Sequence, residues 1–171
     1  TILAPYRPDL EAIPEHILAP ATERGDRVHK IVAALAQGLW VPRIPEECKG
    51  YVESWQGWFD RYVEEVGFVE KRLYHPLYCY TGMIDFYGLL QGIGWCLVDY
   101  KSPIQSHPVW RGQLAAYQTL MKSEGYQVDN VGTLQLHPQG KTPKMIWLED
   151  SAAAFNAFLG ALGAYFYFNG R

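Results

Sequence analysis

The chain has 171 residues, 49% of them hydrophobic and 19% charged, which fits one folded domain with a buried core and excludes an intrinsically disordered protein. Its formal net charge of −3 is not that of a protein whose whole surface binds nucleic acid. Any basic binding surface must therefore be local, and the expected contributors are Lys101, Arg111, Lys122, Lys141 and Lys144.

The chain contains three cysteines but no C-x-x-C pair, so neither a zinc ribbon nor an iron–sulfur cluster is indicated. An odd cysteine count without a secretory leader predicts a cytoplasmic protein. The most apolar run, Ala152 to Phe168, falls at the short limit for a membrane span. Phe155, Phe158 and Leu162 recur in it at helical spacing, so we expect a helix docked on the core and no membrane partner.

The order of the predicted elements is ααβββαββα. A proline-rich, irregular arm (residues 1–20) opens the chain, and the residues that follow change from helical to alternating periodicity and back. This order predicts an α/β domain over residues 1–171, with a central mixed sheet of about five strands flanked by helices. The expected elements are helices at about 22–37 and 47–65, strands at 67–75, 79–87 and 93–102, a helix at 108–125, strands at 128–137 and 144–148, and a helix from about 149.

Two carboxylates and a lysine are the main candidates for a functional site. Asp85 lies in the predicted strand 79–87, and Asp99 and Lys101 end the predicted strand 93–102. Because successive strand residues point to opposite faces, Asp99 and Lys101 share a face. The glycine-rich segment between the strands suits a hairpin loop, which would bring Asp85 close to Asp99.

Like charges that face each other across strands destabilise a sheet, and a divalent cation between them removes that cost. Carboxylate oxygens are ligands that Mg²⁺ prefers, and the backbone carbonyl of Tyr100 lies beside them in the sequence. Lys101 would orient a water or stabilise the charge on phosphate oxygens. The pattern predicts a metal-dependent phosphodiesterase that uses Mg²⁺ or Mn²⁺. The alternative role for Lys101 is a simple salt bridge to Asp99 or Asp85.

Five further residues are candidates for the same site. Glu70, on the preceding strand, would reach the metal through a water or complete a second metal site, or it is a surface glutamate. His29, beside the apolar stripe of the first helix, would add a nitrogen ligand that favours Mn²⁺ tolerance, or it is structural. Gln113 and Tyr117 share a helix face and would contact DNA, or they pack in the core. Arg111, on another face of that helix, would contact the DNA backbone.

In the order and approximate spacing of five motifs, the chain resembles the PD-(D/E)xK nuclease superfamily, and most of all its RecB-type exonuclease branch. The resemblance spans about residues 24 to 120 and implies a restriction-endonuclease-like core. The motifs that carry it are Gly25-x-x-x-His29, Glu70, Gly82-x-x-Asp85, Asp99-x-Lys101 and Gln113-x-x-x-Tyr117.

The resemblance implies metal ligands from four residues: His29, Asp85, Asp99 and the main chain of Tyr100. It also implies a reaction, the metal-dependent hydrolysis of DNA that leaves a 5′-phosphate and a 3′-hydroxyl. Relatives that carry four cysteines for an iron–sulfur cluster differ from this chain, which has only three.

The resemblance assigns roles to the remaining motif residues as well. Lys101 is the expected catalytic lysine and Glu70 an active-site acid, while Gln113 and Tyr117 form the helix motif beside the DNA. The chain is similar to the small stand-alone nucleases of phage recombination modules, for which the expected location is the host cytoplasm. The expected substrate is linear DNA with free ends, double- or single-stranded. A homo-oligomer and a recombination or single-strand-binding protein are the further expected partners.

Two other functions stay open from the sequence. One is a structure-specific or sequence-specific endonuclease on the same scaffold. The other is a non-catalytic module that binds DNA or protein, which the acidic net charge favours and the intact Asp85, Asp99 and Lys101 oppose.

Overall fold

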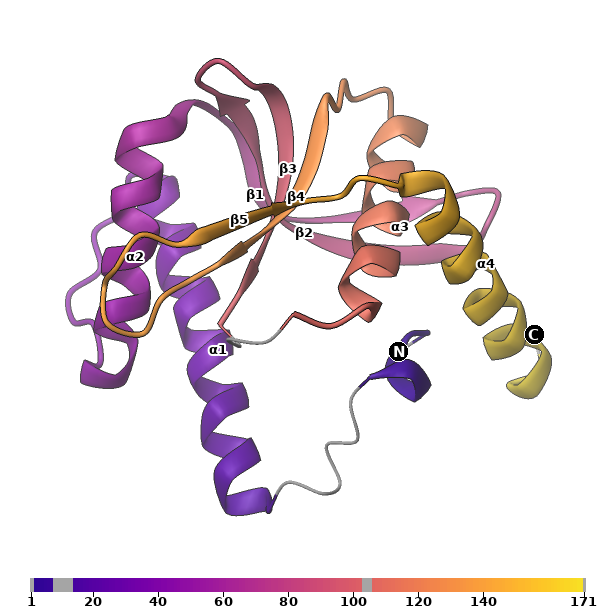
Figure 1. Ribbon diagram of the computed structural model, residues 1–171, viewed down its shortest axis with the longest axis horizontal. Coiled ribbons are helices and arrows are strands. Elements are labelled where there is room, and N and C mark those ends of the chain that lie inside the picture. Colours follow the sequence, from indigo (N-terminus) through magenta and orange to yellow (C-terminus); the bar gives the residue numbers. More distant parts are fainter. Residues whose placement is uncertain (1, 8–13, 103–105, 171) are drawn as a thin grey trace.

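A computed structural model describes residues 2–7, 14–102 and 106–170 (Figure 1). It confirms an α/β protein with the element order ααβββαββα and a five-stranded mixed sheet on which the helices pack. The described elements are η1 (a 3-10 turn, Ala4–Tyr6), α1 (Glu15–Ala36), α2 (Glu46–Tyr62), β1 (Val63–His75), β2 (Tyr80–Leu90), β3 (Gly94–Lys101), α3 (Val109–Ser123), β4 (Asn130–Gln135), β5 (Lys144–Trp147) and α4 (Ser151–Phe168).

The strands lie in the order β1-β2-β3-β4-β5. The pairs β1–β2, β2–β3 and β4–β5 are antiparallel, whereas β3 and β4 are parallel. A parallel pair needs a crossover connection, and α3 provides it between β3 and β4. Helices α1 and α2 lie on one side of the sheet, and α3 and α4 lie on the other (Figure 1).

Strand β3 divides its side chains between the two resulting cores. Val98 and Tyr100 belong to the apolar cluster with α1 and α2, and Leu97 belongs to the cluster with α3 and α4. Leu97, Val98 and Tyr100 are almost fully buried, as expected for a strand that is central in the sheet. Since Asp99 and Lys101 follow Leu97 at alternate positions, strand alternation directs them toward the α3 side.

Helix α1 begins at Glu15, earlier than the sequence pattern predicted, and contains Pro20. The expected irregular arm is therefore wrong for residues 15–20, and its residues 1 and 8–13 lie outside the described part of the chain. Helix α2 ends at Tyr62, before the predicted position, because Val63 turns to an extended conformation and pairs with Leu90.

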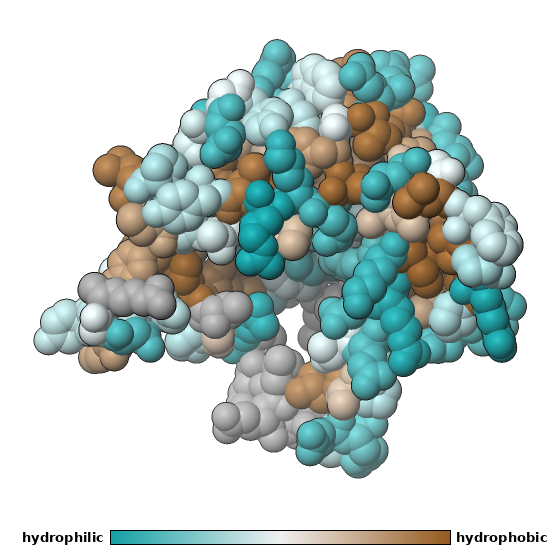
Figure 2. Space-filling model, turned by 180° about the vertical axis from the view of Figure 1, so that it is seen from behind, coloured by the Kyte–Doolittle hydropathy of each residue, from teal (hydrophilic) through white to brown (hydrophobic). Residues whose placement is uncertain are grey.

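Helix α4 docks on the core, as its helical spacing predicted, and its partner there is α3. Asp150 caps its N-terminus by accepting a hydrogen bond from the Ala153 amide at 3.0 Å, and Phe158 and Leu162 are buried. By length and composition α4 would also be able to cross a membrane, and 22% of it is buried in the protein. Phe168 near its end is 81% exposed. In Figure 2, which views the molecule from behind, α4 lies at the left, and apolar surface is visible there.

Candidate functional site

The β2–β3 ladder stops at the position where the sequence predicted paired carboxylates. The last pair on this side is Phe86 with Val98, so the next residues in register are Asp85 and Asp99. Beyond that pair, Oδ2 of Asp85 accepts a hydrogen bond from the amide of Tyr100 at 2.8 Å. A side-chain carboxylate thus satisfies a buried backbone donor, and β2 and β3 remain connected where their ladder has ended.

Strand β1 is irregular at the same level. Val69 pairs with Phe86 and Lys71 pairs with Ile84, so Glu70 lies opposite Asp85. Glu70 has a φ of 49°, in the left-handed region that few non-glycine residues adopt. Strained backbone of this kind is concentrated at functional sites, where the surrounding structure holds it in place.

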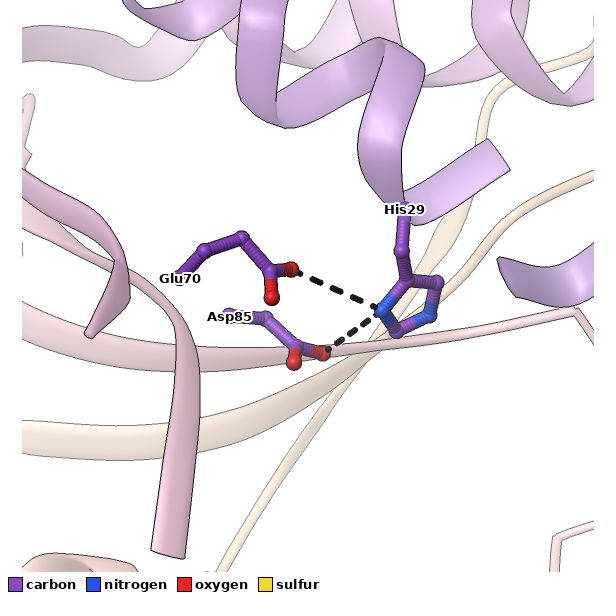
Figure 3. Close-up of side chains that lie close together, drawn as sticks. All are labelled: His29, Glu70 and Asp85. Carbon is purple, nitrogen blue, oxygen red and sulfur yellow. Dashed lines mark ion pairs between the residues drawn. The ribbon is translucent and has the colours of Figure 1, made fainter. Parts of the chain in front are cut away.

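Helix α1 brings His29 to these two carboxylates (Figure 3). Its Nδ1 lies 3.5 Å from Asp85 Oδ2 and 4.0 Å from Glu70 Oε1. Its Nε2 lies 3.1 Å from the backbone oxygen of Tyr100. The neighbouring Val28 is buried against the sheet, which fixes the helix face and therefore the position of the imidazole.

Asp99 and Lys101 form an ion pair, with Nζ of Lys101 2.6 Å from Oδ2 of Asp99. The side chain of Asp99 is only 3% exposed and that of Lys101 is 18% exposed. A buried carboxylate is costly without a partner, and Lys101 provides that partner here. Lys101 is the last residue of β3, so the ion pair lies at the end of that strand.

The site has an unusual protonation pattern because five ionisable groups lie close together. Burial lowers the pKa of His29, but its hydrogen bond to Asp85 and the charges of Asp85 and Asp99 outweigh this and raise the pKa to about 9. Burial raises the pKa of Asp99 to about 6, against the opposing effect of Lys101. Burial and the charge of Asp85 raise the pKa of Glu70. The cluster therefore favours a positive charge at the position of His29.

The donor atoms of His29, Glu70 and Asp85 lie within 4.8 Å of one another, which fits ligands that share one metal ion. Ligands about 2.1 Å from an octahedral ion lie about 3–4 Å apart, so small rotations of the side chains would complete such a set. The Tyr100 carbonyl is a further oxygen beside His29, at Nε2, the ring nitrogen that does not face the carboxylates.

The sequence had assigned Asp99 to the metal and Glu70 to a less defined acidic role. Among the described residues, Glu70 joins His29 and Asp85, whereas Asp99 is paired with Lys101. The Asp99 carboxylate still lies close enough for the charges of Asp85 and His29 to act on its pKa.

Gln113 and Tyr117 meet on α3, where the amide of Gln113 donates a hydrogen bond to the Tyr117 hydroxyl at 2.8 Å. Burial and, secondarily, the charge of Asp99 raise the pKa of Tyr117, so the pair lies near the carboxylates. Gly82 explains this approach: a Cβ at that position would lie 2.5 Å from the Tyr117 ring. The glycine of the Gly82-x-x-Asp85 motif thus lets α3 lie directly on β2.

Sequence reasoning missed two neighbours of this site. Arg7 lines a small cavity together with Gln113 and Tyr117, and no sequence pattern connects residues so far apart. Trp110 is the other neighbour, and its ring centroid lies 5.9 Å from Nζ of Lys101. Arg111 is exposed at the same end of α3, as its predicted helix face required.

No model of a known protein family matches the chain, and no curated protein sequence matches it.

Proposed function

We propose that this protein is a metal-dependent deoxyribonuclease, most specifically an exonuclease. The observation that carries the proposal is the Lys101–Asp99 ion pair next to the His29, Glu70 and Asp85 donor group. A lysine and several carboxylates around a cation site suit phosphodiester hydrolysis, which needs positive charge against the phosphate and a positioned water. The resemblance to PD-(D/E)xK nucleases supports DNA as the substrate.

In this proposal His29, Asp85 and Glu70 hold the cation, with Asp99 and the Tyr100 carbonyl available to it. A divalent cation bound there supplies a more acidic water and positive charge next to the phosphate. Since the donor set contains an imidazole nitrogen, both Mg²⁺ and Mn²⁺ are expected to support activity.

Lys101 acts on the substrate once DNA competes for its ammonium group. Its Nζ is held by Asp99 in the free protein, so it lies ready beside the proposed position of the phosphate. There it orients the attacking water and stabilises charge on the phosphate oxygens. Gln113 and Tyr117 border the DNA, and the exposed Arg111 contacts its backbone.

The decisive experiment is digestion of end-labelled linear DNA with Mg²⁺, Mn²⁺ or EDTA. We expect cleavage with either metal, and a loss of at least about 100-fold for Lys101→Met and for Asp99→Asn. The first substitution removes the cation beside the phosphate, and the second removes the carboxylate that holds Lys101 in place. Lys49→Met is the matched control, since Lys49 is an exposed lysine paired with Glu46 on α2. Metal-dependent cleavage that survives both site substitutions would contradict the assignment.

Covalently closed circular DNA distinguishes the two catalytic alternatives. An exonuclease leaves it intact and degrades the same DNA after linearisation, whereas an endonuclease cuts both forms. If neither form is cut and calorimetry detects no Mn²⁺ binding, a non-catalytic binding module is the better description.

A further inference from the structure

A cavity of about 470 Å³ opens beside the Asp99–Lys101 pair, between the start of α3 and strands β4 and β5. We call it the Trp110 cavity. Its volume lies within the range of about 300–1,000 Å³ that is typical of small-molecule sites. The lining residues that matter here are His107, Trp110, Arg111, Thr133, Ile146 and Glu149.

Two contacts connect the Trp110 cavity to the proposed reaction centre. Thr133 pairs with Asp99 across the parallel strands β3 and β4. The Trp110 ring faces Lys101, with 5.9 Å between Nζ and the ring centroid. A ligand in the cavity would therefore lie one side chain away from the phosphate that Lys101 is proposed to contact.

The residues that line the cavity are suited to bind a flat aromatic ring with polar groups at its edge. Trp110 and Ile146 offer aromatic and aliphatic surface, and Trp110 is only partly buried in the free protein. Thr133, His107 and Glu149 supply hydroxyl, imidazole and carboxylate groups that are able to hydrogen-bond to the edges of a base. Arg111, at the rim and exposed, is a cation for an adjacent phosphate.

We infer that the Trp110 cavity receives the base of a nucleotide next to the scissile phosphate, with Trp110 as its stacking surface. The inference rests on the proposed nuclease function and narrows its substrate. A base inside the cavity is neither paired nor stacked in a duplex, so the preferred DNA is single-stranded or frayed at the cleaved end. A blunt duplex end must first unpair, which costs free energy and slows cleavage.

The first test compares steady-state cleavage of a single-stranded oligonucleotide by the wild type, Trp110→Ala and Trp110→Phe. Stacking of a base on an aromatic side chain contributes about 1–3 kcal/mol, so Trp110→Ala should lower kcat/KM roughly 5- to 160-fold, mainly through KM. Trp110→Phe retains a stacking surface and should recover most of that loss. Trp40→Ala is the matched control, because Trp40 is 84% exposed in the connection between α1 and α2.

The second test removes the base instead of the side chain. In a series of oligonucleotides, one nucleotide at a time is replaced by an abasic analogue, and cleavage is followed bond by bond. The wild type should be slowed at the bond beside the abasic position by about the factor that Trp110→Ala causes on intact DNA. In Trp110→Ala the abasic nucleotide should cause no additional slowing at that bond, because the alanine variant has no ring on which the missing base would have stacked.

The outcomes separate this inference from the proposed function. If the wild type cleaves DNA but a folded Trp110→Ala protein cleaves it equally well, the cavity inference is wrong and the nuclease assignment stands. Additive effects of Trp110→Ala and the abasic nucleotide also overturn the inference. If circular dichroism shows that Trp110→Ala is unfolded, the inference is tested instead by Trp110→Phe and by the abasic series on the wild type. A wild type that cleaves no DNA overturns both proposals.

Discussion

At the scale of single residues, the site gathers charges that a metal-free protein can tolerate only by protonation and pairing. His29 lies among carboxylates that raise its pKa to about 9, and Lys101 neutralises Asp99. A cation that binds here must displace the proton of His29, because only the neutral imidazole is a ligand. Proton and metal therefore compete for the same position.

We predict that the metal-free protein loses stability as the pH rises from 6.5 to 9. The pKa of His29 is raised in the folded state, from an ordinary value of 6.5 to about 9. Its protonation thus stabilises the fold fully below pH 6.5, and this contribution is lost as the pH passes through 9. The pKa of Asp99, about 6, lies below this window.

The measurement is urea unfolding in EDTA across this pH range, with an expected fall on the order of 1–3 kcal/mol. His29→Gln should flatten the dependence, whereas His16→Gln should not, because His16 is exposed near the start of α1. An equal slope in His29→Gln and the wild type would show that another group is responsible.

At the scale of elements, close contacts between strand and helix backbones position the site. Gly82 on β2 lets Tyr117 of α3 approach, since a Cβ would lie 2.5 Å from the tyrosine ring. The turn between β1 and β2 depends on Cys79, which has a φ of 52°. Cys79 directly precedes β2 and Gly82 lies on it, so both features position the strand that carries Asp85, one of the candidate metal ligands.

Gly82→Ala should destabilise the protein by about 1–3 kcal/mol, because the added methyl group forces Tyr117 and Leu120 away from the strand. Gly57→Ala is the control: nothing lies within 4 Å of its added Cβ on α2, and alanine should stabilise the helix by up to about 1 kcal/mol. Urea unfolding measures both. Equal effects of the two substitutions would exclude the close approach of α3 as the cause.

Cys79→Gly should be more stable than Cys79→Ala by about 1 kcal/mol, since only glycine adopts a positive φ at little steric cost. Both substitutions remove the same exposed thiol, so the comparison isolates the backbone conformation. Thermal unfolding under reducing conditions is the measurement. An alanine variant as stable as the glycine variant would show that the turn relaxes to another conformation.

At the scale of the whole molecule, the site joins the two layers of helices. His29 comes from α1 on one side of the sheet, and Gln113 and Tyr117 come from α3 on the other. The sheet ends its β2–β3 ladder between them, so groups from both sides approach the same carboxylates. Ligand binding at this point should stabilise the entire domain.

Mn²⁺ at about 100 times its dissociation constant should stabilise the folded protein by about 2.7 kcal/mol, which corresponds to a rise in Tm of roughly 5–10 °C. Thermal unfolding with Mn²⁺ or EDTA at constant pH measures the rise. It should be much smaller in His29→Gln and unchanged in His16→Gln. A rise of equal size in all three proteins would indicate that the metal binds elsewhere.

Local patterns predicted much of the fold, because hydrophobic periodicity depends on neighbours in the chain. The strand that ends in Asp99 and Lys101 and the helix that carries Gln113 and Tyr117 were both expected from it. Element ends were predicted less well where a distant partner decides them. Val63 left the helical pattern because it pairs with Leu90, which lies beyond any local window.

The sequence by itself determined the order ααβββαββα and the shared face of Asp99 and Lys101, since both follow from periodicity. Only the tertiary structure decided how the charges are partnered. It joined Glu70 to His29 and Asp85, and of the two salt-bridge partners that the sequence left open for Lys101, Asp99 and Asp85, it selected Asp99. The physical reason is that these partners depend on the end of the β2–β3 ladder and on the packing of α1 against the sheet, and neither is encoded by the spacing of the residues along the chain.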